Sequence, residues 1–276
     1  PPRSTPLYSS AASDVYKRQG IPNAVNKKII HCTVDELHVN KVYPTAQALI
    51  GDARCTLQAL QAELNAATGG QGCPARNVAA EVKSARDSAL AQYRTAMASN
   101  DRPINPYRVY AGLMEVLDPH KSFLTHESGN TRDQLSTVYD TLIPRGFLGW
   151  GNVSSLGFSL AATIAAKIAF PDRHCVAVTG EAGLGYMMGN LEVPLRQKLG
   201  ITVVHISNGG FAGYGPGFWG DGHDPYTHEV LGPEEIDMSK VIGELGYHTE
   251  RVTEPSEVGL ALRRALSAND SAQPSY

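Results

Sequence analysis

Two apolar segments, each ending in glycine and polar residues, decide the fold. The first reads CVAVTGEAG (Cys175–Gly183) and the second reads ITVVHISNGG (Ile201–Gly210). Glu181 and Asn208 follow the two apolar runs and are separated by 208 − 181 = 27 residues. One helix and one parallel strand fit in that interval, so the chain returns to the same edge of a sheet. We therefore expect the two polar side chains to converge.

Oxygen ligands gather at this edge. A carboxylate, an amide oxygen and a backbone carbonyl freed by the glycines form a hard oxygen site of the kind that Mg²⁺ prefers, with phosphate or water in its remaining positions. The backbone N–H groups of Ala182 and Gly183, at the start of a helix, favour an anion. The pattern predicts a site for a metal and a diphosphate.

Strands and helices alternate along most of the chain, which predicts an α/β fold with a doubly wound parallel sheet. Strands are expected over residues 27–32, 122–125, 175–179, 201–206 and 249–252. Helices are expected over 45–64 (interrupted near 51–52), 77–99, 107–117, 131–141, 156–169, 186–199, 233–245 and 256–266, with a turn at 268–270. The helix over 77–99 is highly polar and is expected to be a solvated linker.

Two breaks divide the chain. Gly- and Pro-containing stretches at 68–74 and 100–106 place domain limits there. The expected parts are a C-terminal remnant of one domain (20–66), a linker (67–104) and a second domain (105–276). Residues 1–19 lack any helical or strand period, and Ser9–Gln19 resembles a translated sequencing adapter, so a non-native or disordered segment is expected there.

Composition excludes several classes of protein. The 276 residues carry 24 Lys+Arg against 27 Asp+Glu, a net charge of −3, which gives no sign of a nucleic-acid partner. No apolar run reaches the roughly 18–20 residues that a membrane span requires. Four scattered cysteines without metal spacing favour free thiols in a reducing cytoplasm.

The run from Gly146 to Gly210 resembles the diphosphate-binding domain of thiamine diphosphate (ThDP) enzymes of the acetolactate synthase type. Their metal motif is Gly-Asp-Gly, followed by Asn-Asn about one helix and one strand later. The resemblance implies that Glu181, the Asn208 side chain and the Gly210 carbonyl bind Mg²⁺. Two residues depart from the motif: Glu181 replaces the usual Asp, and Ser207 replaces the first Asn.

Two further segments share this resemblance. Gly151–Gly157 matches the segment that holds the aminopyrimidine ring, where Leu156 would wedge under the bent cofactor. The Ser154 carbonyl and the Leu156 N–H would hydrogen-bond the ring. Upstream, Asn130 and Thr131 stand in a loop whose side chains touch the diphosphate in the family.

The resemblance covers about residues 26–274, because residues 28–64 are similar to the end of the family's central domain. It implies a 2-oxo acid decarboxylase or carboligase that forms a homodimer or homotetramer. The carboxylate that activates the cofactor would lie in an N-terminal domain, so no catalytic residue is assigned and the chain alone is expected to be inactive. The resemblance allows FAD in a full-length parent, although no residue of this chain can be assigned to it.

Other functions stay open. One alternative is a parent that resembles an oxalyl-CoA or benzoylformate decarboxylase, and another is a non-catalytic ThDP-fold binding protein. An unrelated Rossmann-like nucleotide binder has less support, because no GxGxxG follows an early strand. The triplet Gly220–Gly222 spells the metal motif, but no apolar strand precedes it, and we interpret it as a turn. His223 and His228 nearby are interpreted as part of a solvated loop.

Overall fold

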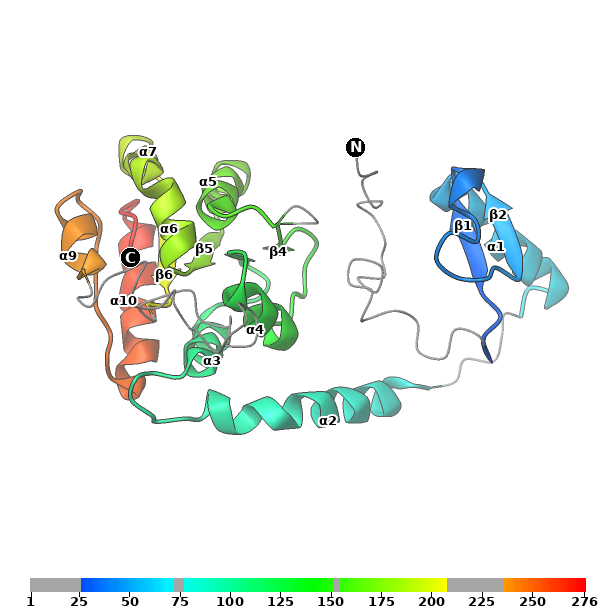
Figure 1. The fold of residues 1–276 in the computed structure, drawn as a ribbon, viewed down its shortest axis with the longest axis horizontal. Coiled ribbons are helices and arrows are strands. Elements are labelled where there is room, and N and C mark those ends of the chain that lie inside the picture. The colour runs from blue at the N-terminus through cyan, green and yellow to red at the C-terminus, as the bar shows by residue number, and fades with distance from the viewer. Residues whose placement is uncertain (1–25, 72–76, 151–153, 208–235) are drawn as a thin grey trace, which may run out of the picture. The chain divides into compact units, whose positions relative to one another are not determined.

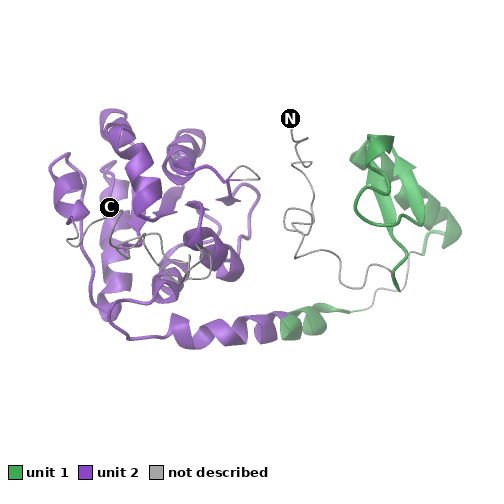
Figure 2. Cartoon of the chain, viewed as in Figure 1, with its two compact units in different colours: residues 1–85 green, residues 86–276 purple. Residues whose placement is uncertain are grey.

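The computed structural model describes residues 26–71, 77–150, 154–207 and 236–276. The chain divides into two compact units, Pro1–Ala85 and Arg86–Tyr276 (Figure 2). The domain limits expected at residues 66/67 and 104/105 stay predictions. Within the described part of the chain, every helix is too short or too polar to cross a lipid bilayer.

The first unit contains a two-stranded parallel sheet and a helix. Its elements are β1 (Ile30–Thr33), η3 (Glu36–His38), β2 (Gln47–Ile50) and α1 (Ala53–Ala67), and the N-terminal part of α2 (Ala79–Met97) also falls within it. The helix expected over residues 45–64 is wrong for residues 45–50, because residues 47–50 form strand β2. The N–H of Ala46 donates to the Ile29 carbonyl (2.8 Å), and that of Gly51 donates to the Thr33 carbonyl (2.9 Å). Pairing with β1 therefore outweighs the local helical composition of this segment.

The second unit is built on a four-stranded parallel sheet with the order β4-β3-β5-β6 (Figure 1). Its strands are β3 (Ser122–His126), β4 (Phe147–Leu148), β5 (His174–Thr179) and β6 (Ile201–His205). The register pairs Phe123 with Cys175, and Cys175 with Ile201. The two central strands, β3 and β5, are buried almost throughout, which explains their apolar sequences. The predicted α/β class with parallel strands is confirmed.

Helices cover both faces of this sheet (Figure 1). Besides α2, its described helices are α3 (Pro106–Val116), α4 (Asn130–Val138), α5 (Phe158–Ala169), α6 (Glu181–Met187), α7 (Glu192–Arg196), α9 (Met238–Gly243) and α10 (Val258–Asp270), with the 3-10 helices η4 (Met188–Asn190) and η5 (Pro255–Glu257). One hydrophobic cluster joins Leu124 and Val176 to α3, α4 and α10, and the other joins Phe123 and Ile201 to α5, α6, α7 and α9. Each fully buried leucine in these clusters contributes roughly 1.5–3 kcal/mol.

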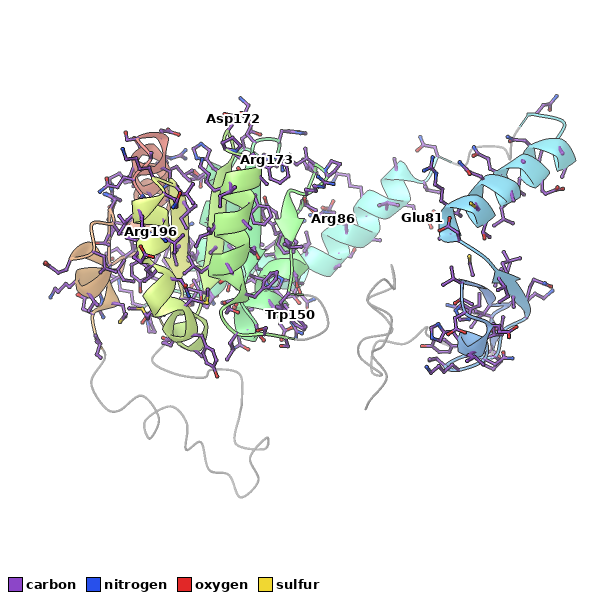
Figure 3. The ribbon with its side chains drawn as sticks, turned by 90° about the horizontal axis from the view of Figure 1, so that it is seen from above. Glu81, Arg86, Trp150, Asp172, Arg173 and Arg196 are labelled. Carbon is purple, nitrogen blue, oxygen red and sulfur yellow. The ribbon has the colours of Figure 1, made fainter. Side chains whose placement is uncertain are left out.

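Helix α2 is present where the polar helix was expected, but one side of it is not solvated. Leu90, Tyr93 and Met97 pack against the first cluster, and the Tyr93 and Tyr107 rings lie 5.0 Å apart. Elsewhere in this unit, the Arg132 guanidinium lies 5.1 Å from the centroid of the Trp150 ring. That contact connects α4 to the residues that follow β4. Trp150 is labelled in Figure 3.

Several sequence-based boundaries differ from the structure. The helix expected over 186–199 begins earlier, at Glu181, and is broken into α6, η4 and α7, with Pro194 inside the first turn of α7, where proline is tolerated. The strand expected over 249–252 is extended backbone that has only an isolated bridge, at His248. The turn expected at 268–270 is the last turn of α10, and α4 ends at Val138. Only α9 is observed in the described part of the helix expected over 233–245.

Candidate functional site

The carboxyl ends of β3, β5 and β6 form the edge at which the sequence predicts a site. Ile206, just after β6, donates its N–H to the Thr179 carbonyl at the end of β5 (2.9 Å). Thr179 precedes Glu181 by two residues, and Ile206 precedes Asn208 by two. This bond brings the two segments together as far as Ser207, where the described residues end. Asn208 and Gly210, both predicted metal ligands, lie outside the described residues, as do Gly220–Gly222, His223 and His228.

Glu181 is the first residue of α6, and its side chain is 18% exposed. Its Oε1 lies 3.9 Å from Nε2 of His205, whose side chain is 5% exposed. Nδ1 of His205 is hydrogen-bonded to the Tyr276 hydroxyl. The predicted carboxylate therefore stands at the sheet edge, partly open to solvent, next to an imidazole held from its other side.

Glu127 is a second carboxylate at this edge, and it is almost completely buried (1% exposed). Ser159 donates its hydroxyl (2.8 Å) and its N–H (3.3 Å) to Oε2, and the Ser128 N–H donates to Oε1 (3.0 Å). Ser159 is the second residue of α5, so its N–H is one of the first four that lack a partner inside the helix. The Glu127 carboxylate thus caps α5 from a different segment of the chain.

The backbone of Glu127 ties further elements together. Its N–H donates to the Val178 carbonyl in β5 (2.8 Å), and its carbonyl accepts from the Thr131 hydroxyl in α4 (3.1 Å). Nδ1 of His126 is also 3.0 Å from this carbonyl. Burial lowers the pKa of His126, which favours a neutral ring that donates from Nδ1. One residue thereby fixes the starts of α4 and α5 relative to the sheet.

Glycines allow the third helix to approach this carboxylate. A Cβ on Gly183, in the first turn of α6, would lie 2.2 Å from Cγ of Glu127, far inside van der Waals contact. Gly157 has a positive φ of 86°, and a Cβ there would lie 2.7 Å from Cγ of Met187. The starts of α4, α5 and α6 therefore meet around Glu127, and the first turns of helices favour negative charge.

The other predicted cofactor residues lie on the segments that meet here. Asn130 and Thr131 begin α4, and the Thr131 side chain is buried with its hydroxyl turned to Glu127. Ser154 has a positive φ of 57°, and its Oγ lies 2.5 Å from Oγ of Ser128. This hydrogen bond links the 128–131 loop to the segment that carries Leu156. Left-handed backbone in a residue with a side chain costs about 1–2 kcal/mol and is found preferentially at functional sites.

The structure thus places the predicted cofactor residues near the carboxyl ends of the strands: Asn130, Thr131, Ser154, Ala182 and Gly183. Sequence reasoning missed Glu127, Ser159 and His205. Glu127 follows an apolar strand at the same edge as Glu181, a position that could have drawn attention to it. Within the described residues no group of three or more His, Cys, Asp or Glu side chains could hold a metal. A cation bound at Glu181 would need other oxygen donors, as Mg²⁺ commonly does.

A known protein family matches much of the second unit. The family model described as thiamine pyrophosphate enzyme, C-terminal TPP binding domain, matches residues 127–275. The match begins at Glu127 and includes every cofactor and metal residue predicted above.

Curated proteins with two kinds of name are similar to this chain. A probable acetolactate synthase large subunit of Methanocaldococcus jannaschii is 26% identical over 259 residues, which are 90% of this chain and 41% of that protein. An acetolactate synthase large subunit of Mycobacterium tuberculosis is 26% identical over 231 residues, 82% of this chain and 39% of that protein. A 2-hydroxyacyl-CoA lyase of Oryza sativa subsp. japonica is 30% identical over 176 residues, 62% of this chain and 29% of that protein. The chain spans about two fifths of the length of the acetolactate synthase relatives.

Proposed function

The chain belongs to the thiamine pyrophosphate enzyme family through its C-terminal TPP-binding domain, and we propose that it binds ThDP together with Mg²⁺ at the carboxyl edge of its four-stranded sheet. The observation that carries this proposal is the meeting of three helix starts around Glu127, with Glu181 partly open to solvent at the end of β5. This arrangement supports an anion and a hard cation side by side.

Each residue has a proposed role in binding. Glu181 would bind Mg²⁺ through its carboxylate, with Asn208 and Gly210 as further oxygen donors. Asn130 and Thr131, at the start of α4, would contact the diphosphate, as would the N–H groups of Ala182 and Gly183. The Ser154 carbonyl and the Leu156 N–H would hydrogen-bond the aminopyrimidine ring.

The chemistry follows from what the cofactor supplies. When bound, ThDP provides an electron sink for a carbanion. The residues of this chain would bind its diphosphate, orient the ring over Leu156 and hold the metal. We place the carboxylate that activates the cofactor in an N-terminal domain of a longer protein. We propose that this longer protein is cytoplasmic and forms a homodimer or homotetramer. The chain by itself would then be inactive.

For that longer protein we propose a 2-oxo acid decarboxylase or carboligase, because relatives named acetolactate synthase align with most of this chain. A CoA-thioester lyase is a second candidate, because relatives named 2-hydroxyacyl-CoA lyase reach 30% identity. A protein resembling oxalyl-CoA or benzoylformate decarboxylase also stays open. Assays of the longer protein with 2-oxo acids and with 2-hydroxyacyl-CoA thioesters would separate these functions, because only the lyase would cleave the thioester substrate.

The metal ligand is tested by thermal unfolding of the purified chain. ThDP with Mg²⁺ should raise the melting temperature, because a ligand at 100 times its Kd stabilises the folded state by about 2.7 kcal/mol. Glu181→Ala should abolish the part of this shift that depends on Mg²⁺, and Glu181→Asp should keep or increase it. Glu192→Ala is the matched control, because it removes an exposed carboxylate that pairs with Arg196. Its melting temperature should rise with ThDP and Mg²⁺ as much as that of the unsubstituted chain. An unchanged Mg²⁺-dependent shift in Glu181→Ala would exclude this carboxylate as a ligand.

A further inference from the structure

His205 is a buried polar side chain at the last position of β6, with 5% of the side chain exposed. The register of β5 and β6 pairs it with Thr179, two residues before Glu181. Side chains alternate along a strand, and Ile201 and Val203 belong to the hydrophobic cluster that includes residues of α6. His205 therefore turns to the face of the sheet that α6 covers, where Glu181 begins that helix.

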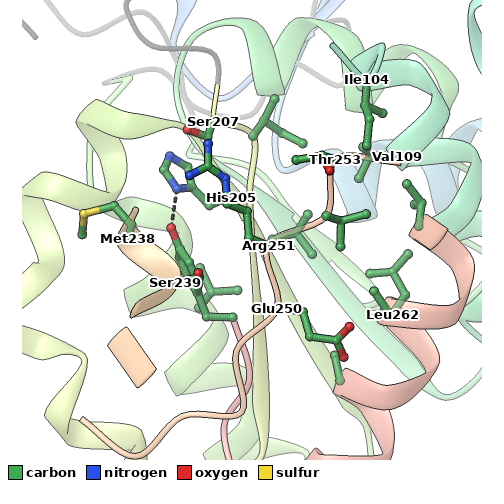
Figure 4. Close-up of a pocket in the computed structure, with 18 of the residues that line it drawn as sticks. Ile104, Val109, His205, Ser207, Met238, Ser239, Glu250, Arg251, Thr253 and Leu262 are labelled. Carbon is green, nitrogen blue, oxygen red and sulfur yellow. Dashed lines mark hydrogen bonds between the residues drawn. The ribbon is translucent and has the colours of Figure 1, made fainter. Parts of the chain in front are cut away.

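Tyr276 holds the imidazole from the other side. Its hydroxyl is hydrogen-bonded to Nδ1 of His205, and the centroids of the two rings lie 5.8 Å apart. The Tyr276 ring packs against the same hydrophobic cluster, and its backbone N–H donates to the His248 carbonyl (2.8 Å). His205 and Tyr276 both line one pocket of the second unit (Figure 4). The orientation of the imidazole is thus fixed, with Nε2 on the side of Glu181.

The chemistry of the three groups indicates where the ring hydrogen lies. A carboxylate oxygen only accepts hydrogen bonds, so a ring nitrogen that faces it is favoured to carry a hydrogen. The tyrosine hydroxyl can donate, and it then donates to Nδ1 of a neutral ring. Nε2 lies 3.9 Å from Oε1 of Glu181, beyond the usual hydrogen-bond range of about 2.7–3.2 Å. A turn about the last side-chain torsion of Glu181 would close this gap.

The Glu181 carboxylate benefits from a fixed partner. It stands at the end of a long side chain that is 18% exposed, and the residue before it, Gly180, has no side chain that could cap α6. A glutamate loses much rotamer freedom when it is held in one conformation. Groups that hydrogen-bond a ligating carboxylate from behind reduce this loss when a cation binds, because the ligand is already oriented.

We propose that His205 is a positioning residue for the cation site: it donates from Nε2 to one carboxylate oxygen of Glu181 and so directs the other oxygen toward the cation. Tyr276 supports it by fixing the ring. This inference rests on the proposed function, because it takes Glu181 to be a ligand of Mg²⁺. His205 would act only through Glu181, without contacting the cation.

The test measures the Mg²⁺ concentration that gives half of the ThDP binding signal in calorimetry. His205→Phe should raise this concentration by about tenfold or more, since partners that orient metal ligands typically change metal affinity 10–100-fold. His205→Gln should recover part of the loss, because its amide N–H₂ can donate from a position near that of Nε2. Tyr276→Phe keeps the ring packing and removes the hydroxyl, so it should cause a smaller rise.

His174→Phe is the matched control. His174 begins β5 at the opposite edge of the same sheet, and its Nε2 lies 3.8 Å from Oδ1 of Asp270, a contact similar to that between His205 and Glu181. This variant should leave the half-saturating Mg²⁺ concentration unchanged. The double variant of Glu181→Ala with His205→Phe should bind Mg²⁺ no more weakly than Glu181→Ala alone, because His205 acts through the same carboxylate.

The outcomes separate this inference from the proposed function. A loss of Mg²⁺ dependence in Glu181→Ala, with none in His205→Phe or an equal one in His174→Phe, would overturn the role of His205 alone. No loss in Glu181→Ala would overturn both. A far larger loss for Ni²⁺ than for Mg²⁺ in His205→Phe would make His205 a direct nitrogen ligand instead of a positioning residue.

Nitrogen-15 NMR of the metal-free chain gives a readout that does not involve the cofactor. The His205 ring should carry its hydrogen on Nε2, where it can be donated to Glu181. A ring without a hydrogen on Nε2 would overturn the proposal, whatever the metal titrations show.

Discussion

At the scale of single residues, Glu127 is a buried carboxylate with three hydrogen-bond donors. Glu127→Gln keeps the size of the side chain. It replaces one carboxylate oxygen, which accepts a hydrogen bond, with an amide N–H₂ group that faces the same donor. We expect the free energy of unfolding to fall by about 1–3 kcal/mol, the cost of an unsatisfied buried polar group. Urea unfolding measures this change. Glu115→Gln, at a carboxylate that is 63% exposed and pairs with Arg263, should cost less than about 1 kcal/mol; equal losses would contradict the account.

Glu250 gives a prediction about pH. Two hydrogen bonds from Arg264 (2.8 and 2.6 Å), with a smaller contribution from His248, hold the pKa of Glu250 below its usual range. Its stabilisation is therefore fully present above the unfolded-state pKa of about 4.3 and is lost as pH falls through the lower folded-state value. Glu250→Gln should lose about 0.5–1 kcal/mol at pH 7 and almost nothing at pH 3. Urea unfolding at both pH values checks this, and a loss of the same size at pH 3 would refute it.

The site residues show what the sequence can predict at this scale. Glu181 could be found because it follows an apolar strand at a spacing that returns the chain to the same edge. Glu127 occupies an equivalent position after β3, but its role depends on Ser159, which is 32 residues away and contributes through the start of α5. His205 lies within an apolar run, so only the structure shows that it faces Glu181.

At the scale of elements, α6 tests whether its start must approach Glu127. Gly183→Ala places a Cβ against the buried carboxylate side chain, so we expect a loss of about 1–3 kcal/mol in stability. Gly185→Ala is the matched control, because it lies in the same helix with nothing within 4 Å of the new Cβ. It should be neutral or stabilise by up to about 1 kcal/mol. If unfolding measurements show no loss of stability for either substitution, the close approach of α6 to Glu127 is contradicted.

Element boundaries also show why sequence prediction failed in places. Residues 45–50 have a composition compatible with a helix, and only their pairing with β1 makes them a strand. Residues 249–252 have a strand-like sequence, yet no strand forms there, and only the neighbouring His248 has an isolated bridge, to Ser275. In both cases the deciding partner is distant in the sequence. Strands β3, β5 and β6 needed no such information, because their apolar runs were sufficient.

At the scale of the whole molecule, the hydrophobic core lies in the second unit, because no described residue before Tyr110 is buried. The second unit contains both hydrophobic clusters and all of the described candidate site. The strand–helix alternation predicted this parallel sheet, and the family match over residues 127–275 falls within the same unit. Cofactor binding is therefore a property that we assign to the second unit.

The most direct test of that assignment is calorimetric titration of ThDP into the purified, folded chain, with and without Mg²⁺. ADP serves as the matched control, because it carries a diphosphate on an unrelated base. The account predicts binding of ThDP that depends on Mg²⁺, and no comparable binding of ADP. Equal binding of both ligands, or ThDP binding that ignores Mg²⁺, would contradict the proposed metal–diphosphate site at Glu181.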